Sequence, residues 1–435
     1  MTETAPGPEI LPRVKSQKAE RLVSLDVFRG LVIVAMLIVN NLYASPAGYF
    51  WKHAEWVDPW PAQAFSQWWH AVSTHALTWT AAFTEFPLWK QCTLADYVMP
   101  WFMLIIGLAI PYSAASMNAR GLPRRAIWKR LIKRTIVLIV LGWILCYFRD
   151  QFTDWLYGPK ATFHISLGMD VLQLLGVGYF VARIFYELPG APRLLIALAL
   201  FIWHWAFLRF WPQGAMPAGT FMESAGHQYT AAQYAYDHWP IFRSLTLIPN
   251  HLTLNCIGLL SVPPAAATML LGTLAGDCLR RADVSDHDKA SRLFWSGALA
   301  AAVGLAWSFD LPFNKPRWTP CYLLWTTGVG LVVIAFLYWL IDIRKIRRLT
   351  YPFIVFGTNA LAVYWLSIMG KVLLLNTPRV HFRGGTSERL VDYLVAALKH
   401  AFGFRFGGWA FTLLFITFWW FVLDFMHRRK LFWKL

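Results

Sequence analysis

Two residues that are suited to proton chemistry lie close together near the start of this chain. Asn40 ends an apolar stretch that begins at Arg21, and His53 follows 13 residues later. An imidazole with a pKa near 6.5 takes up and releases protons at neutral pH. Beside a hydrophobic layer such a group is a candidate functional residue. The alternative is an interfacial histidine beside Tyr49 and Trp51.

Long apolar stretches indicate that a membrane positions these residues. Of the 435 residues, 57% are hydrophobic and 14% are charged. A run of roughly 20 apolar residues crosses a hydrocarbon core about 30 Å thick. We therefore expect an all-α polytopic membrane protein with about ten transmembrane helices, at 23–42, 93–113, 135–149, 166–186, 194–211, 263–279, 293–310, 321–341, 352–374 and 406–426.

The basic residues predict how these spans are oriented. Between the expected spans, 26 Lys and Arg fall on the side that holds both termini, and 11 fall on the other side. Cytoplasmic loops carry the excess of positive charge, so we expect both termini in the cytoplasm and His53 on the opposite face. We expect residues 1–20 to be a disordered cytoplasmic tail. In the last outer loop, Arg389–Phe402 has the pattern of an amphipathic interfacial helix.

The net charge of +17 follows from this topology and favours attraction to anionic membrane lipid. Part of the cytoplasmic excess could instead capture an anionic cosubstrate. We expect no nucleic-acid partner, because the basic residues are divided among many loops. The five cysteines form no C-x-x-C pair and the twelve histidines form no H-E-x-x-H pattern, so we expect no metal.

Six segments, spaced along the chain from residue 21, carry patterns that occur together in one family. They are R-L-V-S-L-D-V-F-R-G from Arg21, H-A-E-W at His53–Trp56, T-L-A-D-Y-V-M-P-W-F-M-L-I-I-G at Thr93–Gly107, V-L-Q-L-L-G at Val171–Gly176, N-K-P-R-W-T-P-C-Y at Asn314–Tyr322 and P-F-I-V-F-G-T-N-A-L-A-V-Y at Pro352–Tyr364. The chain thus resembles the heparan-alpha-glucosaminide N-acetyltransferase family and its bacterial relatives.

This resemblance implies one transmembrane acyltransferase-like domain over residues 21–435, in the inner membrane of a bacterium. Residues 57–92 are longer than the family's usual spacing and form an outer, aromatic-rich insert. Family members move acetyl from cytosolic acetyl-CoA to an amino sugar on the outer, periplasmic side. As partners we therefore expect a small amino sugar or glycan, membrane lipid and a second copy of the chain in a homodimer.

The resemblance also assigns catalytic roles. The family's active histidine aligns on His53, and its pore asparagine aligns on Asn40. His53 would take a proton from the ammonium group of the sugar, or it would carry the acetyl group itself. Asn40 would donate its amide N–H to the developing oxyanion.

Polar residues at the ends of the spans could bind the donor and the acceptor. Arg29 could contact the phosphates of CoA while Asp26 orients it. Their spacing of three residues fits a structural ion pair equally well. Asp96 could hold the ammonium group of the sugar or orient His53, or it could pair with a backbone group or a lysine.

A short outer loop and three positions inside spans complete the candidate site. Trp318 could stack on a sugar or anchor the loop at the membrane interface, and Lys315, beside Asn314, could bind a carboxylate or sulfate or lie in solvent. Polar residues inside the spans could contact a ligand or form hydrogen bonds between helices: these are Gln173, Asn359 and Tyr364.

Another class of function would suit the same scaffold. A transporter or binding protein for N-acetylated amino sugars would also use broken helices that line a cavity. Modification of a cell-envelope glycan or a lipid head group is a third possibility. Turnover of acetyl-CoA by the purified protein separates the first two classes.

Overall fold

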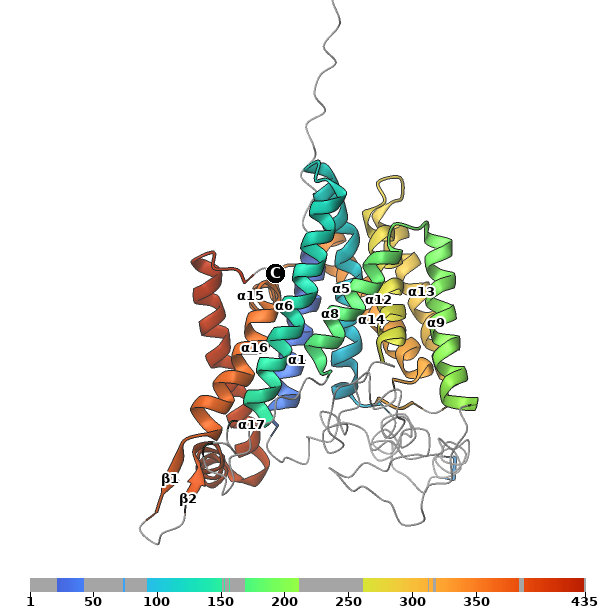
Figure 1. Ribbon diagram of the computed structural model, residues 1–435. Coiled ribbons are helices and arrows are strands. Elements are labelled where there is room, and N and C mark those ends of the chain that lie inside the picture. The colour runs from blue at the N-terminus through green and yellow to red at the C-terminus, as the bar shows by residue number, and fades with distance from the viewer. Residues whose placement is uncertain are drawn as a thin grey trace, which may run out of the picture.

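The computed structural model describes residues 22–42, 73–74, 92–150, 152, 156, 169–210, 261–311, 313–315, 318–382 and 387–433. His53, the tail 1–20 and nearly all of the insert 57–92 lie outside the described residues, so the predictions about them remain predictions. The described chain is almost entirely helical, and its long helices stand side by side as one bundle (Figure 1).

The helices follow one another along the chain as α1 (Val23–Asn40), α5 (Leu94–Ala119), α6 (Arg124–Asp150), α8 (Val171–Phe185), α9 (Gly190–Phe210), α12 (Val262–Arg280), α13 (Asp286–Trp307), α14 (Pro320–Leu337), α15 (Thr350–Thr358), α16 (Ala360–Lys371) and α17 (Leu390–Arg428). Two π-helical segments, η3 (Tyr338–Ile343) and η4 (Val372–Asn376), continue α14 and α16. The strands β1 (Arg379–His381) and β2 (Ser387–Arg389) form an antiparallel hairpin.

Each of the ten apolar runs expected from the sequence contains a helix. Among the described helices, seven are long and apolar enough to cross a membrane, which confirms the all-α polytopic membrane fold. The pair α15–α16 would form one more span, bent by 78°. The helix α8 has only 15 residues and α13 begins with polar residues, so the count of about ten spans is not confirmed.

The run expected at 135–149 begins earlier in the structure. The helix α6 starts at Arg124. Its first turns are basic, so the apolar run that predicts the span begins only after them. The apolar run covers only the later part of α6.

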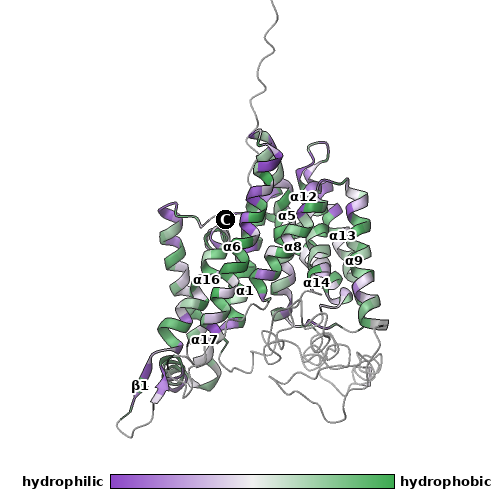
Figure 2. Ribbon diagram, viewed as in Figure 1, coloured by the Kyte–Doolittle hydropathy of each residue, from purple (hydrophilic) through white to green (hydrophobic). Residues whose placement is uncertain are grey.

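The two ends of the bundle differ in character. The turns at 120–123, 281–285 and 344–349 and the C-terminal residues 429–433 gather at the upper end in Figure 1, which we call the basic end. Figure 2 shows hydrophilic residues in the turns at this end, as in the β1–β2 hairpin at the other end, and hydrophobic residues along the helices. At the opposite end, which we call the far end, α1 finishes and α5 and α8 begin. The basic end is the one expected to face the cytoplasm.

Two glycines allow α1 and α15 to touch backbone to backbone. A Cβ atom at Gly30 would lie 1.9 Å from the carbonyl oxygen of Phe353, and one at Gly357 would lie 2.0 Å from the carbonyl oxygen of Asp26. No larger residue fits at either position without moving a helix, as at other small-residue contacts between membrane helices. This contact places Arg29 beside the break in the expected span 352–374.

That span breaks at Asn359, whose φ of −121° and ψ of 36° interrupt the helix between α15 and α16. A second interruption, at Gly403 with φ of 79° and ψ of 160°, divides α17. The left-handed φ is one that glycine adopts readily. The segment before Gly403 is therefore a separate helix, as expected for 389–402, although its position at a membrane interface is not tested.

Candidate functional site

A partly open cavity of about 400 Å³ lies among the helices of the bundle, lined by α1, α5, α6, α8 and the broken pair α15–α16. It extends from Trp433 near the basic end to Val171 and Leu172 in the first turn of α8, at the far end. Most of its wall is apolar, and no Asp or Glu is among the described residues that line it. Its volume is in the range of small-molecule binding sites.

Arg29 lines this cavity from α1. Its Nη1 lies 3.3 Å from Oδ1 of Asp26 and donates a hydrogen bond to the carbonyl oxygen of Gly357 at 3.3 Å. The structure therefore contains the ion pair that the three-residue spacing predicts. It also leaves the Arg29 side chain 26% exposed, with the guanidinium at the cavity wall.

Arg134 brings a second guanidinium to the same cavity, from α6. Its guanidinium carbon lies 4.5 Å from the centre of the Tyr179 ring. Its Nε is buried, and no described residue accepts a hydrogen bond from it. The sequence analysis does not single out Arg134, because it is one of many basic residues on the expected cytoplasmic side. The available signal was its position ten residues inside a long helix, deeper than an anchor at the membrane surface requires.

The C-terminal segment covers the cavity at the basic end. The fully buried side chain of Asn359 donates to the carbonyl oxygen of Leu431 and accepts from the backbone N–H of Trp433, both at 3.2 Å. The Trp433 ring packs edge-on against Trp365, with centroids 5.9 Å apart. The predicted ligand contact of Asn359 stays a prediction, since in this structure its amide binds the chain's own C-terminal segment.

We expect Asn359→Ala to release this segment. The change removes two hydrogen bonds of a buried amide and leaves backbone groups unpaired, which costs about 1–3 kcal/mol. A cysteine placed at Leu431 should then react faster with a membrane-impermeant maleimide in the Asn359→Ala protein than in the protein that keeps Asn359. Ser367→Ala is the matched control, because Ser367 is also buried on α16 and donates to Tyr364 in its own helix. Equal labelling rates in all three proteins would show that Asn359 does not hold the segment.

Tyr364 and Gln173 lie toward the far end of the bundle. Tyr364 lines the cavity. The side-chain oxygen of Gln173 accepts from the backbone N–H of Asp170 at 3.2 Å, within the capping box that starts α8. Asp170 in turn binds Arg149 of α6 at 2.5 Å. The side-chain nitrogen of Gln173 also donates to Sγ of Cys146 on α6 at 4.0 Å, so Gln173 makes the contact between helices that was one of its two expected roles. Ligand contact by Tyr364 stays a prediction.

Asn40 stands exposed at the far end of α1. Its backbone carbonyl accepts a hydrogen bond from Nζ of Lys371 at 2.8 Å. Lys371 is seven residues from Tyr364 on α16, so the two side chains lie on the same face of that helix. The expected span 352–374 contains Lys371, to which the sequence assigns no role. The neighbouring Asn41 is buried, and its side-chain oxygen has no hydrogen-bond donor among the described residues.

Four predicted substrate-binding residues form a separate cluster, at the far end of α5. Asp96 is fully buried, accepts from Thr93 and lies 3.5 Å from Nζ of Lys315. The backbone N–H of Asn314 donates to Thr319 at 3.0 Å. Trp318 is 1% exposed and has a positive φ of 52°.

This cluster therefore joins Asp96 to Lys315 but does not line the cavity. Pairing with a backbone group and with a lysine was the structural alternative expected for Asp96, and both partners are present. The expectation that Trp318 anchors the loop at the membrane surface does not fit its burial inside the protein. A sugar contact by these side chains stays a prediction, because His53 and the insert lie outside the described residues.

The described residues contain no group of three or more His, Cys, Asp or Glu side chains that could hold a metal ion.

Taken together, the fold and this cavity define a polytopic α-helical membrane protein with a buried site lined by guanidinium groups. The chain is 22% identical to the heparan-alpha-glucosaminide N-acetyltransferase of Mus musculus over 473 aligned positions, covering 98% of this chain and 62% of the mouse protein. It is 27% identical to the Homo sapiens protein of the same name over 172 positions, covering 40% of this chain and 20% of the human protein. No family model matches the chain.

These similarities confirm the predicted resemblance to this family. The chain spans about three fifths of the length of the mouse relative.

Proposed function

We propose that this protein is a transmembrane N-acetyltransferase that moves the acetyl group of acetyl-CoA to the amine of an amino sugar. The observation that carries the proposal is the cavity lined by Arg29 and Arg134, in a chain related along nearly its whole length to such an enzyme. Two fixed cations beside an apolar passage suit a donor with phosphates at one end and a neutral thioester arm at the other.

The donor enters from the basic end. Arg29 and Arg134 bind its phosphates, and the apolar wall contacts the pantetheine arm. From Arg29 to Asn40 is 11 residues of helix, about 16 Å at 1.5 Å per residue, which an extended pantetheine arm can span. The phosphates then stay near water and avoid the cost of burying charge in hydrocarbon.

The transfer itself takes place at the far end. His53 removes a proton from the ammonium group of the sugar, since an ammonium has no lone pair for attack. The free amine adds to the thioester carbonyl, and the amide of Asn40 stabilises the oxyanion. When this intermediate collapses the C–S bond breaks, and the proton lost by the attacking nitrogen protonates the departing CoA thiolate. Lys371 fixes the end of α1 through the carbonyl of Asn40. Acetylation of His53 as an intermediate is the two-step version of the same transfer.

In this proposal the basic end faces the cytoplasm of a bacterial cell, the far end faces the periplasm, and the protein works as a homodimer in the inner membrane. Single-cysteine variants in a background without the native cysteines test the orientation. We expect an impermeant thiol reagent added outside intact cells to label a cysteine at Lys52 and to spare one at Arg125. Labelling at Arg125 and protection at Lys52 would reverse the orientation.

The bent pair α15–α16 also favours a second candidate. A helix broken by 78° beside a cavity is a feature of secondary transporters, in which unwound backbone contacts the substrate. A transporter of N-acetylated amino sugars would bind its sugar without consuming acetyl-CoA.

Turnover by the purified protein decides between the two. The protein in detergent is mixed with acetyl-CoA and a panel of amino sugars that begins with glucosamine, and free thiol is followed as CoA is released. The proposal predicts release that depends on one or more of the sugars. Sugar binding with no release of thiol would favour the transporter.

A further inference from the structure

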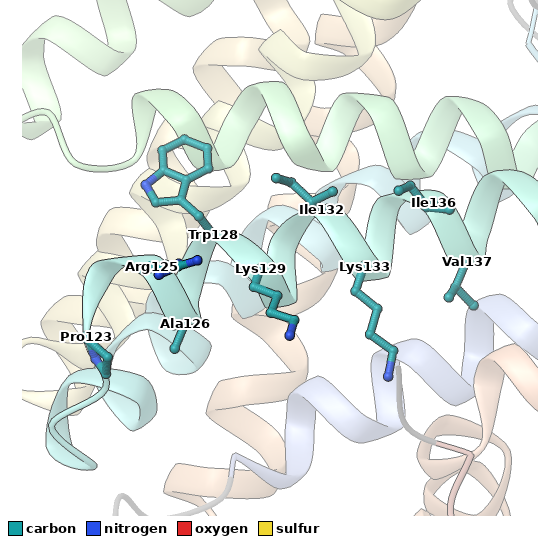
Figure 3. A pocket seen from close by; sticks show the side chains of 9 residues that line it. All are labelled: Pro123, Arg125, Ala126, Trp128, Lys129, Ile132, Lys133, Ile136 and Val137. Atoms are coloured by element: carbon teal, nitrogen blue, oxygen red, sulfur yellow. The ribbon is translucent and has the colours of Figure 1, made fainter.

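The face of α6 that points away from the bundle carries an apolar row and a basic row side by side. Trp128, Ile132 and Ile136 follow one another at intervals of four residues and are 43%, 45% and 54% exposed. Figure 3 shows these three side chains on one side of the helix, with Lys129 and Lys133 pointing to the other side. Together with Arg125, which is also exposed, they line an open groove at the basic end.

The basic row has no counter-charge within the described part of the protein. Residues 124–134 hold six Lys or Arg and no Asp or Glu. No ion pair or hydrogen bond joins the side chains of Arg125, Lys129 or Lys133 to another described residue. These three charges are therefore available to an anion from outside the chain.

The depth of the groove places it at the boundary between head groups and hydrocarbon. Lys133 lies 17 residues before the last residue of α6, about 26 Å at 1.5 Å per residue. A hydrocarbon core is about 30 Å thick. With the far end of α6 at one boundary, Lys133 lies near the other, and Lys129 and Arg125 extend into the head-group layer. Ile136 then faces the acyl chains.

We propose that this groove is a binding site for one anionic phospholipid. The lipid phosphate lies among Arg125, Lys129 and Lys133, and an acyl chain lies along Trp128, Ile132 and Ile136. The tryptophan at the junction suits this position, because an indole ring favours the interface between head groups and hydrocarbon. Basic pockets on the cytoplasmic side of transmembrane helices recognise lipid head groups in the same way.

A second copy of the chain fits this face less well than a lipid. Two copies with the same membrane orientation are related by an axis along the membrane normal. The basic row of one copy would then meet the same row of the other at the same depth, and like charges placed together are unfavourable. An anionic head group neutralises the row instead.

Native mass spectrometry of the purified full-length protein tests the site. Dioleoyl phosphatidylglycerol and dioleoyl phosphatidylcholine are added in equal amounts, and bound copies of each are counted. We expect a preference for phosphatidylglycerol that falls by roughly tenfold or more in the triple variant Arg125→Gln/Lys129→Gln/Lys133→Gln, since each cation near the surface contributes to anionic lipid binding. The conservative variant Lys129→Arg/Lys133→Arg should keep the preference.

The matched control removes three other charges at the same end. Lys345, Arg347 and Arg348 are exposed in the turn before α15, away from the groove. The variant Lys345→Gln/Arg347→Gln/Arg348→Gln should keep the preference for phosphatidylglycerol. An equal loss in both triple variants would mean diffuse attraction and would overturn the site. A groove variant that loses its dimer but keeps its bound lipid would also overturn the proposal, in favour of a second copy.

Discussion

Replacing His53 by alanine should lower the rate of acetyl transfer by roughly 10²–10⁴-fold, the usual contribution of a general base. The physical reason is that glucosamine is largely an ammonium ion near neutral pH and cannot attack a thioester until a proton is removed. If His53 carries the acetyl group itself, the loss is larger still, because no nucleophile remains for the first step. Release of CoA from acetyl-CoA in the presence of the sugar is the measurement.

Two controls separate chemistry from folding in this experiment. CoA should bind the His53→Ala protein with nearly unchanged affinity, since the phosphates are bound at the other end of the cavity. His381→Ala changes an exposed histidine in the β1–β2 hairpin at the far end and should leave the rate unchanged. An undiminished rate in His53→Ala would falsify its role as base or acetyl carrier.

The second large effect is expected at the two cavity arginines. The double variant Arg29→Gln/Arg134→Gln should raise the Kd for CoA by about 100-fold or more, because a hydrogen bond to a charged group contributes about 1.5–3 kcal/mol. Added salt should weaken CoA binding to the unaltered protein, and it should do so less in the double variant. Isothermal titration calorimetry of CoA at two salt concentrations measures both effects.

Single variants identify which arginine acts on the ligand and which acts on the fold. Arg130→Gln removes an exposed cation one turn before Arg134 on α6, outside the cavity, and should leave the affinity for CoA unchanged. Asp26→Asn breaks the ion pair with Arg29 but keeps the guanidinium, so its effect on the affinity should be small. A large loss of CoA affinity in Asp26→Asn, together with no loss of affinity in Arg134→Gln, would indicate that Arg29 has a structural role only.

Much of this arrangement follows from local sequence patterns. The positions of the helices follow from apolar runs, and the ion pair between Asp26 and Arg29 follows from a spacing of three residues on one helix. The capping box in which Asp96 accepts from Thr93 is equally local. In each case the partners lie within a turn of each other, so the regular geometry of the helix brings them together.

The parts that could not be predicted depend on contacts between distant segments. Lys371 and the carbonyl of Asn40 are 331 residues apart, and Asn359 is 74 residues from Trp433. The side of α6 from which Arg134 enters the bundle depends on how α6 packs against α8. Trp318 is buried in a loop whose Lys315 pairs with Asp96 of α5, whereas a tryptophan in an outer loop usually indicates a membrane interface. No local spacing encodes these contacts.

In the proposed mechanism an acetyl group crosses the membrane through this protein while CoA stays on the basic side. Sealed inside-out membrane vesicles that contain the protein and trapped glucosamine test it directly, with acetyl-labelled acetyl-CoA added outside. We expect labelled N-acetylglucosamine inside the vesicles and CoA outside, and no product with the His53→Ala protein. Labelled product that forms only when glucosamine and acetyl-CoA are on the same side, or no product from a protein that still binds CoA, would contradict it.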